Sequence, residues 1–227
     1  YMQFFTVPVT GGFPEQLVIP NGYHASYSPD GTHMAYTPNT DAFRQWKNYR
    51  GGTMSRIWIF SFSDHSYIEI PRPEGGCNDV DPMWIGNTIY FLSDRNGEFN
   101  IFAYDLETGS ITQQTSFNDF PVLHASHHGN DIIFEQAGYL HTFDPATGIT
   151  SKITVGIAAD LLELRPRFVS GEKYIRSSHI SPSGARAVFD FRGEIITVPA
   201  EKGDPRNLTG TNWAHEKYPA WSPDGKE

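Results

Sequence analysis

Aromatic and basic side chains alternate in a long connection at residues 38–55. Trp46 and Tyr49 are three positions apart and are interleaved with Lys47 and Arg50, just before a pair of glycines. This spacing favours a short helical turn with aromatic rings on one side and cations on the other. The cations could meet a peptide carboxylate or an acidic patch on another domain or subunit. We therefore expect these four residues to contact substrate or a neighbouring domain.

A structural role for the same segment is the main alternative. The aromatic side chains would then only pack the connection against its own sheet, and the cations would be solvated. Connections of this length are usually functional or disordered. The large apolar anchors make disorder the weaker option.

No complete set of catalytic residues accompanies this segment. The sequence has no Gly-x-Ser-x-Gly nucleophile elbow and no glycine-rich phosphate loop. Cys77 follows two glycines and has no base that the sequence places beside it, so we do not expect a nucleophile there. We expect no catalytic residue and no cofactor in this chain.

Three histidines, His124, His127 and His128, form the one dense histidine cluster of the sequence. Imidazole is a common metal ligand. In a strand, however, His127 and His128 point to opposite faces. We expect a structural or solvated role and no metal site, and any further role of the cluster stays open.

Acidic residues near the middle of the chain, Asp79, Asp81 and Asp94, have two possible roles. They could imitate a catalytic pair or a calcium loop, but calcium needs six to eight oxygen ligands and no dense Asp/Asn loop provides them. Short Asp side chains commonly bond backbone N–H groups in turns. We expect that role, together with Asp–Arg pairs that tie neighbouring loops.

Charge and composition exclude several classes of partner. The 227 residues include 17 basic and 26 acidic side chains, a formal net charge of −9. An acidic surface argues against nucleic acid and against an anionic membrane. The single cysteine excludes an internal disulfide. We expect a cytoplasmic protein, although a periplasmic one is also compatible.

Internal repeats predict the architecture. One pattern recurs along the chain. It consists of an aromatic or apolar strand end, then a polar turn closed by glycine, then a second apolar strand. The turn glycines are 31, 86, 129, 184 and 225, with spacings of 55, 43, 55 and 41. The shorter spacings match the ~40–45 residues of a four-stranded propeller blade. Alternating strands that end in an Asp turn follow at 100–109 and 139–148. We predict an all-β chain of β-propeller blades, each of four antiparallel strands, rather than a β-sandwich.

The two long spacings each imply an extra segment. One is the connection at 38–55. The other, at 156–178, has the pattern of a segment outside any blade, and Pro166 interrupts strand pairing within it. We also expect the chain to be a fragment, because its last residues form a Ser-Pro-Asp-Gly turn that should lead into another strand.

Two stretches resemble the N-terminal propeller region of the tricorn protease family. Residues 43–53 (Phe-Arg-Gln-Trp-Lys-Asn-Tyr-Arg-Gly-Gly-Thr) are similar to part of its first propeller. Residues 165–168 with 181–195 are similar to the segment of chain that leads from its first propeller into its second. The Ser-Pro-Asp-Gly hairpins resemble blades of the TolB and prolyl-oligopeptidase type. The resemblance implies that residues 1–168 are the C-terminal blades of a six-bladed propeller. Residues 169–227 would be the junction and first blades of a seven-bladed one.

The same resemblance implies a function. The chain would be a non-catalytic part of a tricorn-like serine protease, serving as channel, scaffold and assembly surface for peptide degradation. Its partners would be peptide substrates and the other domains and subunits of a homo-oligomer. The catalytic residues would lie beyond Glu227, and the residues that hold a substrate carboxylate before Tyr1. Two alternatives remain: a TolB-like protein-binding propeller, and the propeller cap of a prolyl-oligopeptidase-like hydrolase.

Overall fold

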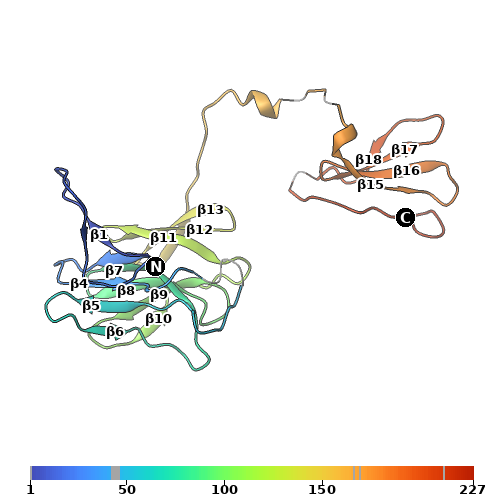
Figure 1. Cartoon of the computed structure of the whole chain (residues 1–227). Helices are drawn as coiled ribbons and strands as arrows, with labels where there is room; N and C mark the ends of the chain where they lie inside the picture. The colour runs from blue at the N-terminus through green and yellow to red at the C-terminus, as the bar shows by residue number, and fades with distance from the viewer. Residues whose placement is uncertain (1, 42–46, 166, 169, 212) are drawn as a thin grey trace. The chain divides into compact units, whose positions relative to one another are not determined.

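The computed structural model describes residues 2–41, 47–165, 167–168, 170–211 and 213–227. Strands make up nearly all of its regular structure, with short 3₁₀ turns and no α-helix in those ranges (Figure 1). The chain divides into two compact units, Tyr1–Ile157 and Ala158–Glu227. In the described ranges, no helix has the length and apolar character needed to cross a membrane.

The first unit contains three four-stranded antiparallel sheets, each with its strands in chain order, and one small hairpin. The hairpin pairs β1 (Phe5–Thr6) with β2 (Glu15–Gln16). The first sheet consists of β3 (Ala25–Tyr27), β4 (His33–Tyr36), β5 (Trp58–Ser61) and β6 (Tyr67–Glu69). The second consists of β7 (Asp79–Ile85), β8 (Thr88–Ser93), β9 (Asn100–Asp105) and β10 (Ile111–Gln113). The third consists of β11 (Val122–His128), β12 (Asp131–Gln136), β13 (Tyr139–Asp144) and β14 (Ile149–Lys152).

The turn between β3 and β4 shows why the hairpin motif folds as it does. The Gly31 amide donates to the Ser28 carbonyl over 2.9 Å, and Gly31 has a φ of 71°, which favours glycine. The Asp30 carboxylate accepts hydrogen bonds from the Ser28 hydroxyl and from the Thr32 amide. These bonds lower the pKa of Asp30 to about 2. The predicted turn is confirmed.

The second repeated signature also forms as predicted. Asp105 ends β9 and accepts hydrogen bonds from the Glu107 and Thr108 amides. Asp144 ends β13 and accepts one from the Ala146 amide. Hydrogen bonds to the turn lower the pKa of both carboxyls. Each Asp therefore closes the turn between the third and fourth strand of its sheet.

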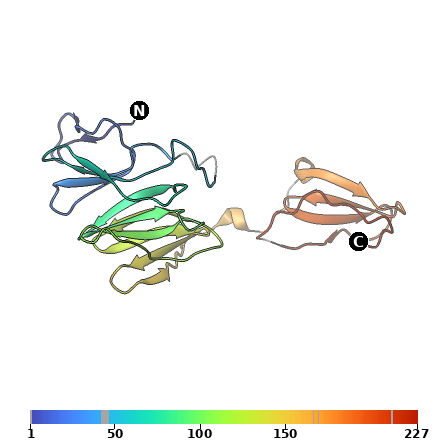
Figure 2. The same ribbon diagram turned by 90° about the horizontal axis from the view of Figure 1, so that it is seen from below.

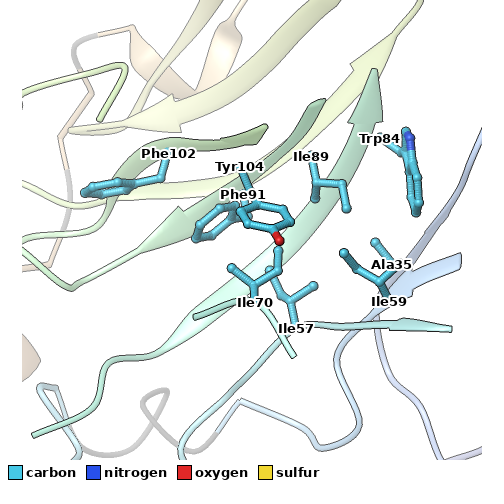
Figure 3. Close-up of a cluster of buried hydrophobic side chains, with 9 residues drawn as sticks. All are labelled: Ala35, Ile57, Ile59, Ile70, Trp84, Ile89, Phe91, Phe102 and Tyr104. Carbon is cyan, nitrogen blue, oxygen red and sulfur yellow. The ribbon is translucent and has the colours of Figure 1, made fainter. Parts of the chain in front are cut away.

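Apolar clusters hold the sheets together face to face. Figure 3 shows the cluster between the first and second sheets. Its members are Ala35 and Ile59 of the first sheet, Ile57 and Ile70 directly beside its strands, and Trp84, Ile89, Phe91, Phe102 and Tyr104 of the second sheet. A second cluster, which includes Leu92, Ile101, Phe134 and Phe143, joins the second sheet to the third. Burying each of the larger side chains contributes roughly 2–3 kcal/mol.

The first strands of neighbouring sheets lie together. Strand β7 contacts β3 on one side and β11 on the other. The sheets lie side by side through the first unit, from blue to yellow in Figure 2. Face-to-face packing of four-stranded sheets whose first strands meet is the arrangement of propeller blades. The predicted all-β class and four-stranded blades are confirmed.

The second unit is smaller. It contains the 3₁₀ turns η2 (Leu162–Leu164) and η3 (Glu172–Tyr174) and a fourth sheet. The sheet consists of β15 (Ile175–Ile180), β16 (Arg186–Phe191), β17 (Glu194–Pro199) and β18 (Arg206–Asn207). Strand β15 takes the last residues of the predicted junction at 156–178, whose earlier described residues carry no strand. The division at residue 168 into two propellers stays a prediction.

Candidate functional site

Lys47 and Arg50 of the connection at 38–55 face carboxylates in the loop between β8 and β9. Lys47 pairs with Glu98 over 2.5 Å, and Arg50 pairs with Asp94 over 2.7 Å. Lys47 and Asn48 form a turn, and the described residues 47–55 contain no helix. Phe43, Arg44 and Trp46 lie outside the described residues. Contact of this segment with substrate or another domain stays a prediction.

Asp94 anchors this segment to the sheet. Its carboxylate is 1 % exposed and accepts a hydrogen bond from Arg50 Nη1 at 2.7 Å. It also accepts from the Asn78 amide at 2.7 Å and from Asn78 Nδ2 at 2.9 Å. Asn78 Nδ2 donates in addition to the Tyr49 carbonyl. The predicted Asp–Arg tie between loops exists, and Arg50 rather than the adjacent Arg95 is the partner of Asp94.

Arg95 instead pairs with Asp79, and its Nη2 donates to both carboxylate oxygens at 3.1 Å. Burial raises the pKa of the Asp79 carboxyl, and the Arg95 guanidinium opposes that shift. Cys77 is fully buried beside this pair and donates its thiol hydrogen to Asp79. Burial and the Asp79 carboxylate raise the pKa of the Cys77 thiol to about 12. A thiol of this kind is not a nucleophile at neutral pH.

We call the first strands of the three sheets, β3, β7 and β11, the inner strands of the first unit, and two of them carry matching β-bulges. In β7, Asp81 and Pro82 lie opposite one residue of β8, and in β11, His124 and Ala125 lie opposite one residue of β12. Asp81 has a φ of 50° and His124 a φ of 52°, a region that side-chain-bearing residues rarely adopt. Bulges of this kind re-aim a side chain and are frequent beside functional sites.

Asp81 and His124 line a hollow beside the inner strands, which we call the inner hollow. Its volume is about 480 Å³. One wall is apolar, with Val80, Leu92, Phe99, Pro121, Val122 and Leu123. The remaining lining residues are His24, Asp41, Lys47, Asp81 and His124. A second hollow of about 520 Å³ shares His24, Asp81 and His124 with the first. Both volumes lie within the range of small-ligand sites.

The polar part of the inner hollow is centred on a hydrogen-bonded His–Asp pair between neighbouring sheets. His24 Nδ1 lies 2.5 Å from Asp81 Oδ1. The Asp81 side chain is 10 % exposed, whereas that of His24 is 36 % exposed. The pair therefore ties the residue before β3 to the bulge of β7 while part of the imidazole stays accessible from the hollow.

The histidine cluster separates as predicted for a strand. His124 lines the inner hollow, whereas His127 bonds toward Ser26 and the Gly129 carbonyl and His128 is exposed. In the described part of the chain, no three His, Cys, Asp or Glu residues are arranged to hold a metal ion.

His24 was not singled out from the sequence, and neither was its grouping with Asp81 and His124. The repeated blade sequence contained a signal for this grouping. Each of the three lies three residues before an aromatic or histidine residue of its inner strand, namely Tyr27, Trp84 and His127. Aligning the blades on that residue would have brought the three positions together.

Comparisons with known proteins agree with this architecture. Residues 1–149 match the family described as the tricorn protease N-terminal beta propeller domain. A tricorn protease of Thermoplasma acidophilum is 32 % identical over 158 residues, or 70 % of this chain. A tricorn protease homolog of Saccharolobus solfataricus is 29 % identical over 153 residues, or 67 % of this chain. The chain spans 14 % of the length of each of these relatives.

Solved structures give the same result. A crystal structure of the tricorn protease superposes with a TM-score of 0.60 at 25 % identity, covering 92 % of this chain and 20 % of the other. A TolB structure from Acinetobacter baumannii superposes with a TM-score of 0.50 at 19 % identity, covering 90 % of this chain and 50 % of the other. The TolB likeness concerns the fold alone.

Proposed function

The chain belongs to the tricorn protease N-terminal β-propeller family, and from this membership we propose that it is the non-catalytic propeller part of a tricorn-like serine peptidase. Its blades would hold and guide peptides, and hydrolysis would take place at residues in another part of the parent protein. The small share of its relatives' length that the chain spans supports this division of labour.

The inner hollow is the observation that carries the proposal. It combines an extended apolar wall with a few polar groups, which is the usual composition of a ligand site. It lies on the inner strands, where consecutive blades meet. A peptide that follows these strands would pass the histidine and aspartate side chains of successive blades.

A scaffold and assembly role accompanies the guiding role. The third sheet carries exposed large apolar side chains, among them Ile133, Tyr139, Leu140 and Ile149. Exposed apolar patches commonly mark interaction surfaces. We assign this surface to contacts with other domains or subunits of the same protein, in a cytoplasmic homo-oligomer. The second unit would begin a second propeller from residue 169.

The test uses the intact parent protein and fluorogenic peptides. His124→Trp places a large ring in the inner hollow, so KM should rise several-fold while kcat is kept. His128→Trp changes an exposed histidine of the same strand and should leave both constants unchanged.

Equal KM values for wild type and His124→Trp would contradict the guiding role. Peptide hydrolysis by the purified 227-residue chain, surviving repurification, would contradict its assignment as non-catalytic.

A further inference from the structure

We propose that Asn96 is a spontaneous modification site, at which deamidation removes the side-chain amide and gives the loop between β8 and β9 a further carboxylate. The sequence contains two Asn–Gly pairs, Asn21–Gly22 and Asn96–Gly97. The surroundings of the second pair favour the reaction, whereas those of the first pair oppose it. The modified loop is the one that anchors the connection at 38–55.

Deamidation needs only the peptide backbone and water. The backbone nitrogen of the following residue attacks the side-chain amide carbon of the asparagine, and ammonia leaves with the hydrogen of that nitrogen. The product is a five-membered succinimide ring. Water then opens the ring at either of its two carbonyls, which gives aspartate or isoaspartate. A following glycine favours the attack because it has no Cβ to hinder the approach.

The surroundings of Asn96 allow the ring to form. Asn96 and Gly97 are both exposed, and a Cβ added to Gly97 would meet no atom within 4 Å. Asn96 Nδ2 donates to Gln113 Oε1 at 2.8 Å, and this partner is exposed as well. The Gly97 amide donates to the Asp94 carbonyl at 3.1 Å. Both bonds join residues of an exposed turn, so opening them costs little compared with global unfolding.

The surroundings of Asn21 oppose the same reaction. Asn21 Nδ2 donates to the Pro38 carbonyl at 2.5 Å, and the Gly22 amide donates to the Met2 carbonyl at 3.0 Å. Gly22 is buried, and a Cβ placed there would lie 1.9 Å from Phe4 Cε2. Ring formation at Asn21 would therefore displace packed segments, which makes this pair an internal control for the exposed one.

The turn itself requires the glycine that makes Asn96 susceptible. Gly97 has a φ of 115°, a conformation that residues with a Cβ rarely adopt. A residue with a larger side chain would slow the attack but would strain this turn. Susceptibility to deamidation is therefore coupled to the shape of the loop.

The products change the contacts that hold the connection. The Asp94 carbonyl accepts from the Gly97 amide and from Arg50 Nη2, and the Asp94 carboxylate accepts from Arg50 Nη1. Isoaspartate adds one carbon to the main chain inside this turn and so changes the spacing of its hydrogen bond. Either product also places a negative charge within two residues of Asp94 and Glu98, and like charges repel. Deamidation should therefore weaken the attachment of the connection.

Peptide mapping by mass spectrometry tests the proposal on the intact protein. After prolonged incubation at neutral pH, aspartate and isoaspartate should accumulate at Asn96 several-fold faster than at Asn21. The protein unfolded in guanidinium chloride is the control, because without the fold the two Asn–Gly pairs should react at similar rates. Equal rates at the two positions in the folded protein, or an Asn96 that stays intact, would overturn the proposal.

Two variants test the effect on the connection. Asn96→Asp introduces the negative charge directly, so hydrogen exchange of the amides at 47–55 should be faster than in wild type. Asn130→Asp adds the same charge at an exposed turn between β11 and β12 and should leave this exchange unchanged. Equal exchange at 47–55 in the two variants would overturn the effect assigned to the modification.

Discussion

At the scale of single residues, buried charge is placed where it joins segments that are distant in sequence. Asp94 collects donors from Arg50, 44 residues away, and from Asn78. Asp81 pairs with His24, 57 residues away. A carboxylate removed from water is stable only if such partners replace its hydration. These residues therefore determine how the connection at 38–55 and the inner hollow are positioned.

The Asp94 network gives the first prediction. Asp94→Ala leaves the Asn78 amide without its carboxylate acceptor and Arg50 without its carboxylate partner. The free energy of unfolding should fall by about 3 kcal/mol, the scale of breaking a buried pair. Chemical denaturation measures it.

Asp131→Ala, an exposed position, is the control and should stay within about 0.5 kcal/mol of wild type. A similarly small effect of Asp94→Ala would show that the network does not stabilise the fold.

At the scale of elements, the strands follow from local sequence. Strands β9 (Asn100–Asp105) and β13 (Tyr139–Asp144) cover the predicted alternating segments, and the Asp turns follow each of them. Turn chemistry is local, since it depends on Pro, Asp and Gly within four residues. The repeat therefore predicts the blades well.

The inner hollow was harder to predict because it depends on register. Whether Asp81 and His124 lie in bulges is decided by pairing with β8 and β12 and by packing across blades, which sequence spacing does not show. The partners of the adjacent residues Asp94 and Arg95 have the same origin. The two side chains point to different neighbours, so Asp94 pairs with Arg50 and Arg95 pairs with Asp79.

Turn glycines offer a test at this scale. Gly31 has a φ of 71° and open space around it, so Gly31→Ala should destabilise by about 1 kcal/mol through backbone strain alone. Gly52 also has open space but no positive φ.

Gly52→Ala is thus the matched control, and thermal unfolding of both variants should show a loss only for Gly31→Ala. Equal stability of the two variants would mean that backbone strain at the turn is unimportant.

At the scale of the whole molecule, the two units differ in their cores. Of the buried apolar residues in the described ranges, Val188 alone belongs to Ala158–Glu227. All of the others lie in the first unit, and apart from Cys77 and Ala103 they belong to its apolar clusters. Because burial of apolar surface is the main favourable contribution to folding, the second unit should be the less stable one.

Hydrogen exchange of the 227-residue chain tests this difference. Amides of β16 and β17 should exchange faster than those of β8 and β9, although both pairs are central strands of four-stranded sheets. Equal protection in the two sheets would indicate one cooperative unit and would contradict the account of two units.

The central claim is that peptides bind at the inner hollow of these blades. Photo-crosslinking tests it most directly, with a tripeptide that carries a diazirine on one apolar side chain and with the attachment sites identified by mass spectrometry. The account predicts attachment at residues of the apolar wall, Val80, Leu92, Phe99 or Val122. Attachment confined to other surfaces of the protein would contradict it.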